Sequence, residues 1–315
     1  MERRQWMGAW GLVLAFGFAP SAWAAPCATD GSSQDPTAVD EAVTELEDEF
    51  DQAMNAFQEK YQAATTDAER QKVFDDGYPD ASEWFPRFLA IADEHPGSDA
   101  ALRALVWIIQ RGSGESEQEK IANEYLFNDY LLHAGIGALC DSLHYRLDSD
   151  CVAALRRILG ENPAREAKAA AAFALGKVLL RQAEIARLFA GGGGERSGWE
   201  RQYGKPTIDV LSATDPAVLQ KEAEGLFERV SKEFEDVQGS GSDYAARAEG
   251  ELFELRNLQV GKVAPEVAGE DIDGASFKLS DYRGKVVLID FWGNWRPPCR
   301  AMYPHERSLV KKYAD

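Results

Sequence analysis

From Asp35–Pro36 onward, apolar residues recur at the spacing of an α-helix. Asp35 offers an N-cap and Pro36 suits the first turn of a helix. The apolar residues that follow lie three, four or seven positions apart: Val39, Val43, Leu46, Phe50, Phe57 and Tyr61. This spacing predicts one long helix with a continuous apolar stripe and an acidic, solvated opposite face. The same pattern predicts a helix from Asp99 to Gly112 and another that begins at Asp215–Pro216.

Three short segments join helices in this part of the chain, at 94–96, 161–163 and 235–237. Each leads into an Ala-rich helix, and their first residues lie 67 and 74 positions apart, near twice the length of a helix-hairpin repeat of about 34 residues. The pattern predicts an irregular, all-α array of helical hairpins over residues 36–257. It is similar to tetratricopeptide-type solenoids, although the consensus residues of that repeat are mostly absent. The aromatic residues expected in its core are Trp84, Phe85 and Phe88.

The pattern changes at residue 260. Glycines and prolines there interrupt short alternating segments such as 277–279, which is typical of a β-hairpin. The next segment, Val286–Trp292, is almost continuously apolar and predicts a buried central strand. Pro297–Pro298 then begins a predicted helix that carries Cys299, Met302, Leu309 and Tyr313. The chain is therefore predicted to be multidomain, with an all-α part followed by a smaller α/β part.

The N-terminus has the features of a secretory signal peptide over residues 1–24. A basic start precedes an apolar run from Ala9 to Ala19 and an Ala-x-Ala cleavage site at Ala22–Ala24. The run is too short to span a bilayer, and residues 25–35 form a solvated lead-in without periodicity. We expect an exported protein, periplasmic or extracellular, with no transmembrane span in the mature chain. Two alternatives remain, an uncleaved anchor and lipid attachment at Cys27, which the proline before it disfavours.

Composition and charge exclude several classes of function. Lys and Arg total 34 against 53 Asp and Glu, so the net charge of −19 would repel the phosphates of a nucleic acid. The four Cys and four His are too scattered for a zinc module built on paired C-x-x-C spacings. Hydrophobic residues make up 45% of the chain, enough to bury a core. We therefore expect a folded protein without nucleic acid, metal or cofactor.

Cys140 and Cys151 lie eleven positions apart around a predicted inter-helix turn at Leu147–Asp150. In an oxidising compartment this pair can form a disulfide. Two separately buried thiols are the alternative.

Three motifs follow one another in the last 56 residues: Val260–Glu266, Leu279–Lys285 and Phe291–Arg300. On these motifs, residues 260–315 resemble the beginning of the thioredoxin-like redoxin family, of the TlpA and AhpC/TSA type. The family's version of the third motif is F-W-x-x-W-C-P-P-C. The resemblance implies a thioredoxin-like domain that exchanges thiols and disulfides in extracytoplasmic proteins or, less favoured, reduces peroxides. It also implies a thiol electron donor and no cofactor.

The chemistry of that motif needs both sulfurs. The first Cys lies where a strand meets a helix, and the helix N-terminus favours its thiolate, which attacks the substrate disulfide. The second Cys, one turn along the helix, resolves the mixed disulfide and releases the reduced product.

This sequence departs from the family at the attacking sulfur, because Arg296 stands in its place and a guanidinium is no nucleophile. By the same resemblance, Cys299 is the resolving thiol, and Asp290 matches the buried carboxylate that takes its proton. The neighbours that support the motif are Trp295, Pro297 and Pro298.

Several interpretations of Arg296 stay open. It can be a point change or sequencing error in a dithiol enzyme, or the mark of an inactive redoxin used for binding. A third interpretation is one-thiol chemistry through Cys299, whose thiolate Arg296 and the helix N-terminus would favour. The plain alternative to that chemistry is an inert, half-buried thiol.

Residues 260–315 are shorter than a complete thioredoxin-like domain, so we expect this domain to be incomplete and the chain to be a fragment or an early-ended reading frame. An alternative function of a different class also remains. The helical array can act as a non-enzymatic scaffold that binds a partner protein or peptide along a concave surface.

Overall fold

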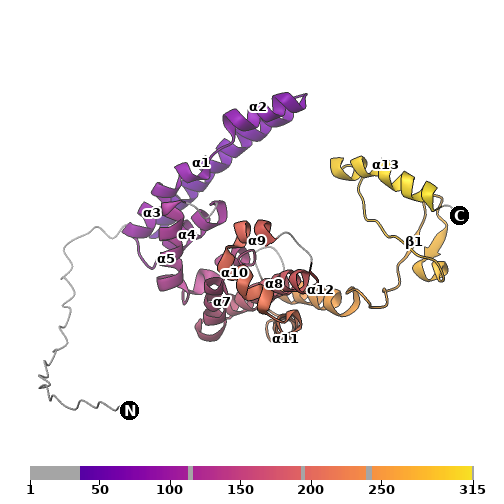
Figure 1. The fold of residues 1–315 in the computed structure, drawn as a ribbon. Coiled ribbons are helices and arrows are strands. Elements are labelled where there is room, and N and C mark those ends of the chain that lie inside the picture. The colour runs from indigo at the N-terminus through magenta and orange to yellow at the C-terminus, as the bar shows by residue number, and fades with distance from the viewer. Residues whose placement is uncertain (1–35, 113–115, 193–195, 239–242, 314–315) are drawn as a thin grey trace, which may run out of the picture. The chain divides into compact units, whose positions relative to one another are not determined.

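The computed structural model describes residues 36–112, 116–192, 196–238 and 243–313 (Figure 1). They divide between Asp80 and Ala81 into two compact units, of which the first ends at Asp80. The predicted signal peptide and lead-in, and with them Cys27, lie outside the described residues. Within the described part of the chain, no helix combines the length and the apolar character needed to cross a bilayer.

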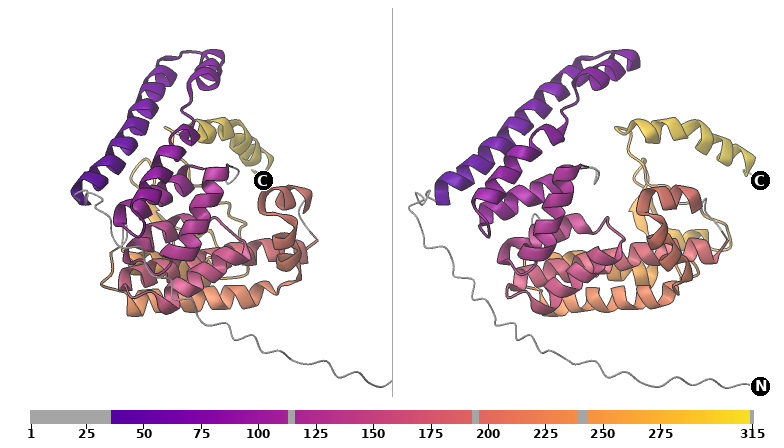
Figure 2. Two further views of the ribbon diagram at one scale, coloured as in Figure 1. Left: turned by 90° about the vertical axis from the view of Figure 1, so that its left-hand side faces the viewer. Right: turned by 60° about the vertical axis from the view of Figure 1, so that its left-hand side comes forward.

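The first unit is a helical hairpin of α1 (Pro36–Ala63) and α2 (Asp67–Gly77), which run side by side in each view (Figure 2). The long predicted helix is thus confirmed, and its apolar stripe is buried except for Tyr61, which is 39% exposed. The side chains of Thr66 and Glu69 form a capping box that begins α2, because each accepts a hydrogen bond from the other residue's backbone N–H. The N–H of Thr65, then its hydroxyl and the N–H of Thr66, donate to the Glu69 carboxylate and lower the pKa of Glu69.

The second unit contains three pairs of contacting helices that follow one another along the chain. They are α3 (Phe85–Glu94) with α4 (Asp99–Arg111), α7 (Ser149–Glu161) with α8 (Arg165–Ala190), and α11 (Pro216–Glu233) with α12 (Tyr244–Asn257). The connections within these pairs overlap the three joining segments that the sequence indicates. The other α-helices before residue 258 are α5 (Glu117–Tyr125), α6 (Gly137–Leu143), α9 (Arg196–Tyr203) and α10 (Lys205–Ala213). Short helical turns lie at Ala81–Glu83, Leu126–Tyr130 and Ala134–Ile136.

Side-chain caps begin several helices, and Asp215 is one that the sequence predicts. The side chain of Asp215 accepts a hydrogen bond from the N–H of Ala217 at 2.9 Å, and Asp148 accepts one from Cys151 at 2.9 Å. The helix predicted from Asp99 to Gly112 is α4, which Gly112 follows as its C-cap. Each cap satisfies a backbone N–H that the helix itself leaves without a partner.

α8 is the helix around which the second unit is built, since it contacts α6, α7, α10, α11 and α12. Its residues from Ala169 to Gly176 are all buried, and most of them are alanines. Small side chains allow neighbouring helices to approach closely. One close approach is at Gly176, where an added Cβ would lie 2.7 Å from the ring of the fully buried Phe227. Among the predicted core aromatics, Phe85 and Phe88 are likewise buried.

The turn between α7 and α8 is fixed by a buried amide, that of Asn162. Its Nδ2 donates to the carbonyls of Leu131 at 2.9 Å and His133 at 3.0 Å, and its Oδ1 accepts from the N–H of Ala164 at 2.8 Å. All of these polar groups would otherwise be costly to bury. One side chain thus ties the start of α8 to the preceding helical turns.

The predicted β-hairpin is confirmed by β1 (Ala268–Glu270) and β2 (Ser276–Lys278), which pair antiparallel with Gly269 opposite Phe277. The carboxylate of Asp271 shapes the turn by accepting from the N–H groups of Asp273 at 2.9 Å and Ala275 at 2.8 Å.

The predicted central strand is wrong for this structure. Val286–Trp292 pairs with no strand among the described residues, and its side chains are exposed, Val286 and Phe291 at 103% and 86%. A central strand is stable when strands hydrogen-bond on both sides and helices cover its faces. In the described part of the chain, the only strands, β1 and β2, pair with each other.

The packing at Gly176 can be tested by substitution. We expect Gly176→Ala to reduce the free energy of unfolding by about 1–3 kcal/mol, because the new methyl group overlaps the Phe227 ring. Urea unfolding followed by circular dichroism measures this change. The matched control is Gly225→Ala in α11, where a Cβ has no neighbour within 4 Å and should be neutral or stabilising by up to about 1 kcal/mol. Equal stability of the two variants would contradict the close approach of α8 and α11.

Candidate functional site

The candidate thiol lies in the first turn of α13 (Pro297–Lys312) (Figure 1). Arg296 is the N-cap residue in extended conformation, and the two prolines occupy the first two helical positions. Proline fits there because its fixed φ suits a helix and its missing N–H costs no hydrogen bond. Cys299 is therefore the third helical residue, and it is half-buried. The helix half of the predicted strand-to-helix junction forms, whereas Val286–Trp292 forms no paired strand among the described residues.

The residues before the helix form a tight turn. The N–H of Arg296 donates to the carbonyl of Gly293 at 2.9 Å, and the N–H of Arg300 donates to that of Arg296 at 3.2 Å. The indole of Trp295 covers Gly293, so that a Cβ at Gly293 would lie 2.7 Å from the ring. Trp295 itself is 83% exposed. The motif therefore presents a large aromatic surface beside the helix start.

Two contacts hold this turn to α13. The rings of Trp292 and Tyr303 meet edge-to-face with centroids 5.5 Å apart, and the hydroxyl of Tyr303 donates to Oδ1 of Asn294 at 3.1 Å. Positions 292 and 294 are thus anchored to a residue one turn beyond Cys299.

Asp290 has its recorded partner on α13 at Glu306. Desolvation of the Glu306 carboxyl, followed by its hydrogen bond to Asp290 and the charge of Asp290, raises the pKa of Glu306. Seven residues separate Cys299 from Glu306, so the two share a helix face about 10 Å apart along the axis. Asp290 thus lies level with Glu306, two turns from the thiol whose proton it is predicted to accept. That role stays a prediction.

Sequence reasoning did not identify Glu306. Its helical position seven residues after Cys299 is the one signal that could have indicated it, because i and i+7 fall on one face.

Cys140 and Cys151 are free thiols in the structure, and both are buried. The Sγ of Cys151 lies 3.5 Å from the carbonyl of Leu143. Burial raises the pKa of Cys151 to about 12 and that of Cys140 as well. Both thiols therefore stay protonated at neutral pH. A disulfide between them in the oxidised protein stays a prediction.

The arrangement around α13 limits the chemistry available. One half-buried thiol at a helix start can form one mixed disulfide, and a second thiol is needed to resolve it. No group of three or more His, Cys, Asp or Glu side chains that could hold a metal ion occurs within the described ranges.

Comparison with known proteins places these residues in context. Residues 260–315 match the family model described as AhpC/TSA family. The chain is 34% identical to thiol-disulfide oxidoreductase ResA of Bacillus thuringiensis (strain Al Hakam) over 67 residues, which are 21% of this chain and 39% of that protein. ResA of Geobacillus kaustophilus (strain HTA426) is 43% identical over 56 residues, 18% of this chain and 32% of its own length. The thioredoxin-like protein YneN of Bacillus subtilis (strain 168) is 40% identical over 58 residues, 18% of this chain and 34% of its own length.

No solved structure matches the chain significantly. The chain spans about two fifths or less of the length of these curated relatives. The resemblance that rests on the three motifs is confirmed, and residues 260–315 correspond to part of a thioredoxin-like domain.

Thiol labelling tests the exposure of Cys299. We expect N-ethylmaleimide at pH 8 to modify Cys299 in the folded protein at least about tenfold faster than Cys140 and Cys151, because burial and raised pKa values keep those two thiols unreactive. Peptide mapping by mass spectrometry gives the rate for each residue. If Cys299 reacts only after unfolding, it is an inert thiol and one-thiol chemistry fails.

The same labelling experiment in denaturant tests whether Cys140 and Cys151 form a disulfide. Free Cys140 and Cys151 become modified as soon as the chain unfolds. A disulfide between them would delay modification until a reductant is added.

Proposed function

We propose that residues 260–315, which match the AhpC/TSA family model, carry the active-site segment of an extracytoplasmic thiol-disulfide oxidoreductase in which Arg296 replaces the attacking cysteine. The observation that carries this proposal is the position of Cys299 in the first turn of α13, directly after the tryptophan-rich turn. This is the place of the second sulfur in the family's motif. The substrates are disulfides of exported proteins, and a thiol compound or protein donates electrons.

In a two-sulfur version of this site, the thiolate at position 296 attacks one sulfur of a substrate disulfide. The substrate S–S bond breaks, one substrate thiolate leaves and takes a proton, and a mixed disulfide forms. The thiolate of Cys299 then attacks the sulfur at position 296 and releases the second substrate thiol. The domain ends as a disulfide, which an external dithiol reduces with two electrons and two protons.

With Arg296 in place, the first step is missing. A guanidinium stays protonated in proteins and forms no bond to sulfur. Its positive charge next to the start of α13 instead favours an anion there. The chain as it stands therefore lacks turnover but keeps the thiol of the resolving step.

Restoring the missing sulfur tests the proposal. In the full chain, we expect Arg296→Cys to form a disulfide with Cys299 on treatment with oxidised glutathione. The reason is that positions 296 and 299 lie within one turn of a helix start. Mass spectrometry detects the loss of two hydrogens, and peptide mapping locates the bond. Reduction of insulin by dithiothreitol should also accelerate at least about tenfold over the unchanged protein.

The matched control is Arg296→Ser, which removes the same charge without adding sulfur and should match the unchanged protein in both measurements. A second control, Arg296→Cys combined with Cys299→Ser, should stop at the mixed disulfide with glutathione. If Arg296→Cys forms no bond to Cys299 and accelerates nothing, the oxidoreductase proposal fails.

A further inference from the structure

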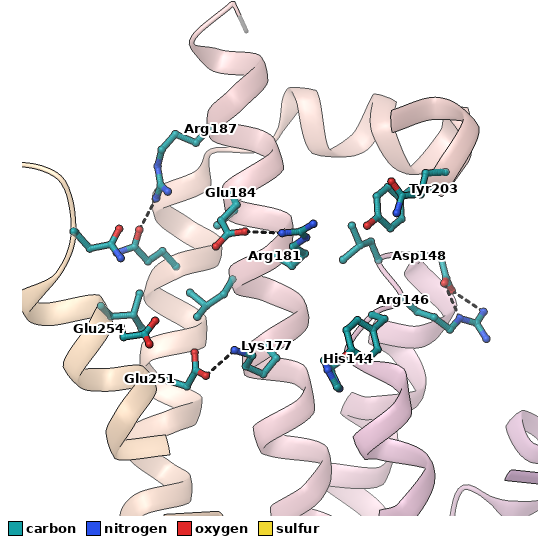
Figure 3. A pocket seen from close by; sticks show the side chains of 18 residues that line it. His144, Arg146, Asp148, Lys177, Arg181, Glu184, Arg187, Tyr203, Glu251 and Glu254 are labelled. Atoms are coloured by element: carbon teal, nitrogen blue, oxygen red, sulfur yellow. Dashed lines mark hydrogen bonds and ion pairs between the residues drawn. The ribbon is translucent and has the colours of Figure 1, made fainter. Parts of the chain in front are cut away.

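A groove of about 810 Å³ lies among the helices of the second unit, away from α13 in the sequence (Figure 3). One face of α8, from Lys177 to Arg187, forms its floor. Residues 144–148, the end of α9 and one side of α12 form its walls. The floor runs ten residues, or about 15 Å, which is the length of about five residues of extended polypeptide.

The charge of this groove differs from that of the whole chain. Four basic and four acidic side chains line it, whereas the chain has 34 basic and 53 acidic residues. Three of each are already paired: Lys177 with Glu251 at 2.6 Å, Arg181 with Glu184 at 3.2 Å, and Arg146 with Asp148 at 3.0 Å. These pairs hold the floor and walls in place and leave little net charge.

Two charged side chains in the groove lack a partner of opposite charge among the described residues. Arg187 donates a hydrogen bond to the neutral amide of Gln220 at 2.7 Å, and the carboxylate of Glu254 has no recorded side-chain partner. Both side chains are exposed. Figure 3 shows Arg187 on α8 and Glu254 on the neighbouring α12, beyond the Lys177–Glu251 pair. One positive and one negative charge thus remain available to a ligand.

The separation of these two charges follows from the helix contacts. Arg247 lies over the ring of Phe173 at 4.1 Å, and further along both helices Lys177 meets Glu251. α8 and α12 therefore run in the same direction, and Glu254 lies about level with Leu180. Arg187 is seven residues beyond that level, or about 10 Å along the axis. This equals about three residues of an extended peptide.

The groove also has apolar and amide surfaces. Leu180 on the floor and Leu255 on the wall lie at the Glu254 end, and glutamine side chains at positions 202, 220 and 259 are also part of the lining. Amides both donate and accept hydrogen bonds, as a peptide backbone requires. A polyanion would meet four carboxylates here, and a polycation would meet four cations.

We propose that this groove binds an extended peptide segment of about five residues with one basic and one acidic side chain three positions apart. The basic side chain pairs with Glu254 and the acidic side chain with Arg187. Small side chains between them lie along the α8 floor beyond Leu180, while the glutamine amides bind the peptide backbone. The groove thereby supplies the helical array with a defined binding surface, and its use does not rest on the thiol chemistry proposed for α13.

Fluorescence anisotropy with labelled hexapeptides and the full chain tests this proposal. The probes are Gly-Lys-Ala-Ala-Glu-Gly and the reversed Gly-Glu-Ala-Ala-Lys-Gly, with both ends blocked. We expect one of the two to bind saturably with a Kd below about 1 mM. Peptides with two Lys or two Glu at the charged positions should bind at least about tenfold more weakly, since each then faces a like charge.

Variants of the chain locate the binding. Glu254→Gln keeps the side-chain length and Arg187→Gln keeps hydrogen-bonding groups, but each removes the charge. Each should weaken binding about tenfold. The matched controls are Glu249→Gln on α12 and Lys221→Gln on α11, which are exposed and do not line the groove. They should bind like the unchanged chain, as should Cys299→Ser.

Three results would overturn the proposal. They are a lack of saturable binding by both mixed-charge peptides, equal binding by the groove variants and their controls, or complete displacement of the peptide by inorganic phosphate, which would identify an anion site instead. A Cys299 that does not react in the thiol experiments leaves the peptide-binding test unaffected. The two proposals can therefore fail separately.

Discussion

The close packing of α8 is the constraint on which the second unit depends. A helix that is contacted by five others has room mainly for small side chains, and the alanines from Ala169 to Ala174 meet that requirement. Alanine contributes little apolar area, so the larger stabilising contribution comes from neighbours such as Phe227, whose burial against a glycine is worth a few kcal/mol. The groove borders the same helix, where Arg181, Glu184 and Arg187 present long polar side chains to it.

Helix positions could be predicted from the sequence because their signals are local. Asp215 caps its helix and Asp99 lies in the first turn after the cap Ser98, so both signals act within one turn. The buried stripe of α1 is likewise a periodicity within one element. The strand prediction for Val286–Trp292 used equally local information, but a strand gains its hydrogen bonds from elsewhere in the chain. The apolar run of Val286–Trp292 suits burial in a sheet. The segment stays unpaired because the described residues provide no partner strand.

The parts of the two candidate sites also differ in whether their sequence signals are local. The position of Cys299 in the first turn of a helix follows from Pro297–Pro298, two residues that favour such a start. The pairing of Asp290 with Glu306 joins residues sixteen positions apart, and the groove combines residues from α8, α9, α11, α12 and the segment 144–148. No spacing rule relates those parts, so their charges could be brought together only by the fold.

The two prolines at the start of α13 also determine what that end of the helix can offer to an approaching polypeptide. A helix N-terminus ordinarily presents several main-chain donors, yet among the first three helical residues here only Cys299 retains an N–H. A backbone carbonyl arriving at this end therefore finds one amide to bind. The exposed indole of Trp295 and the guanidinium of Arg296 lie beside that amide, so the surface at this end of the helix is aromatic and ionic in character.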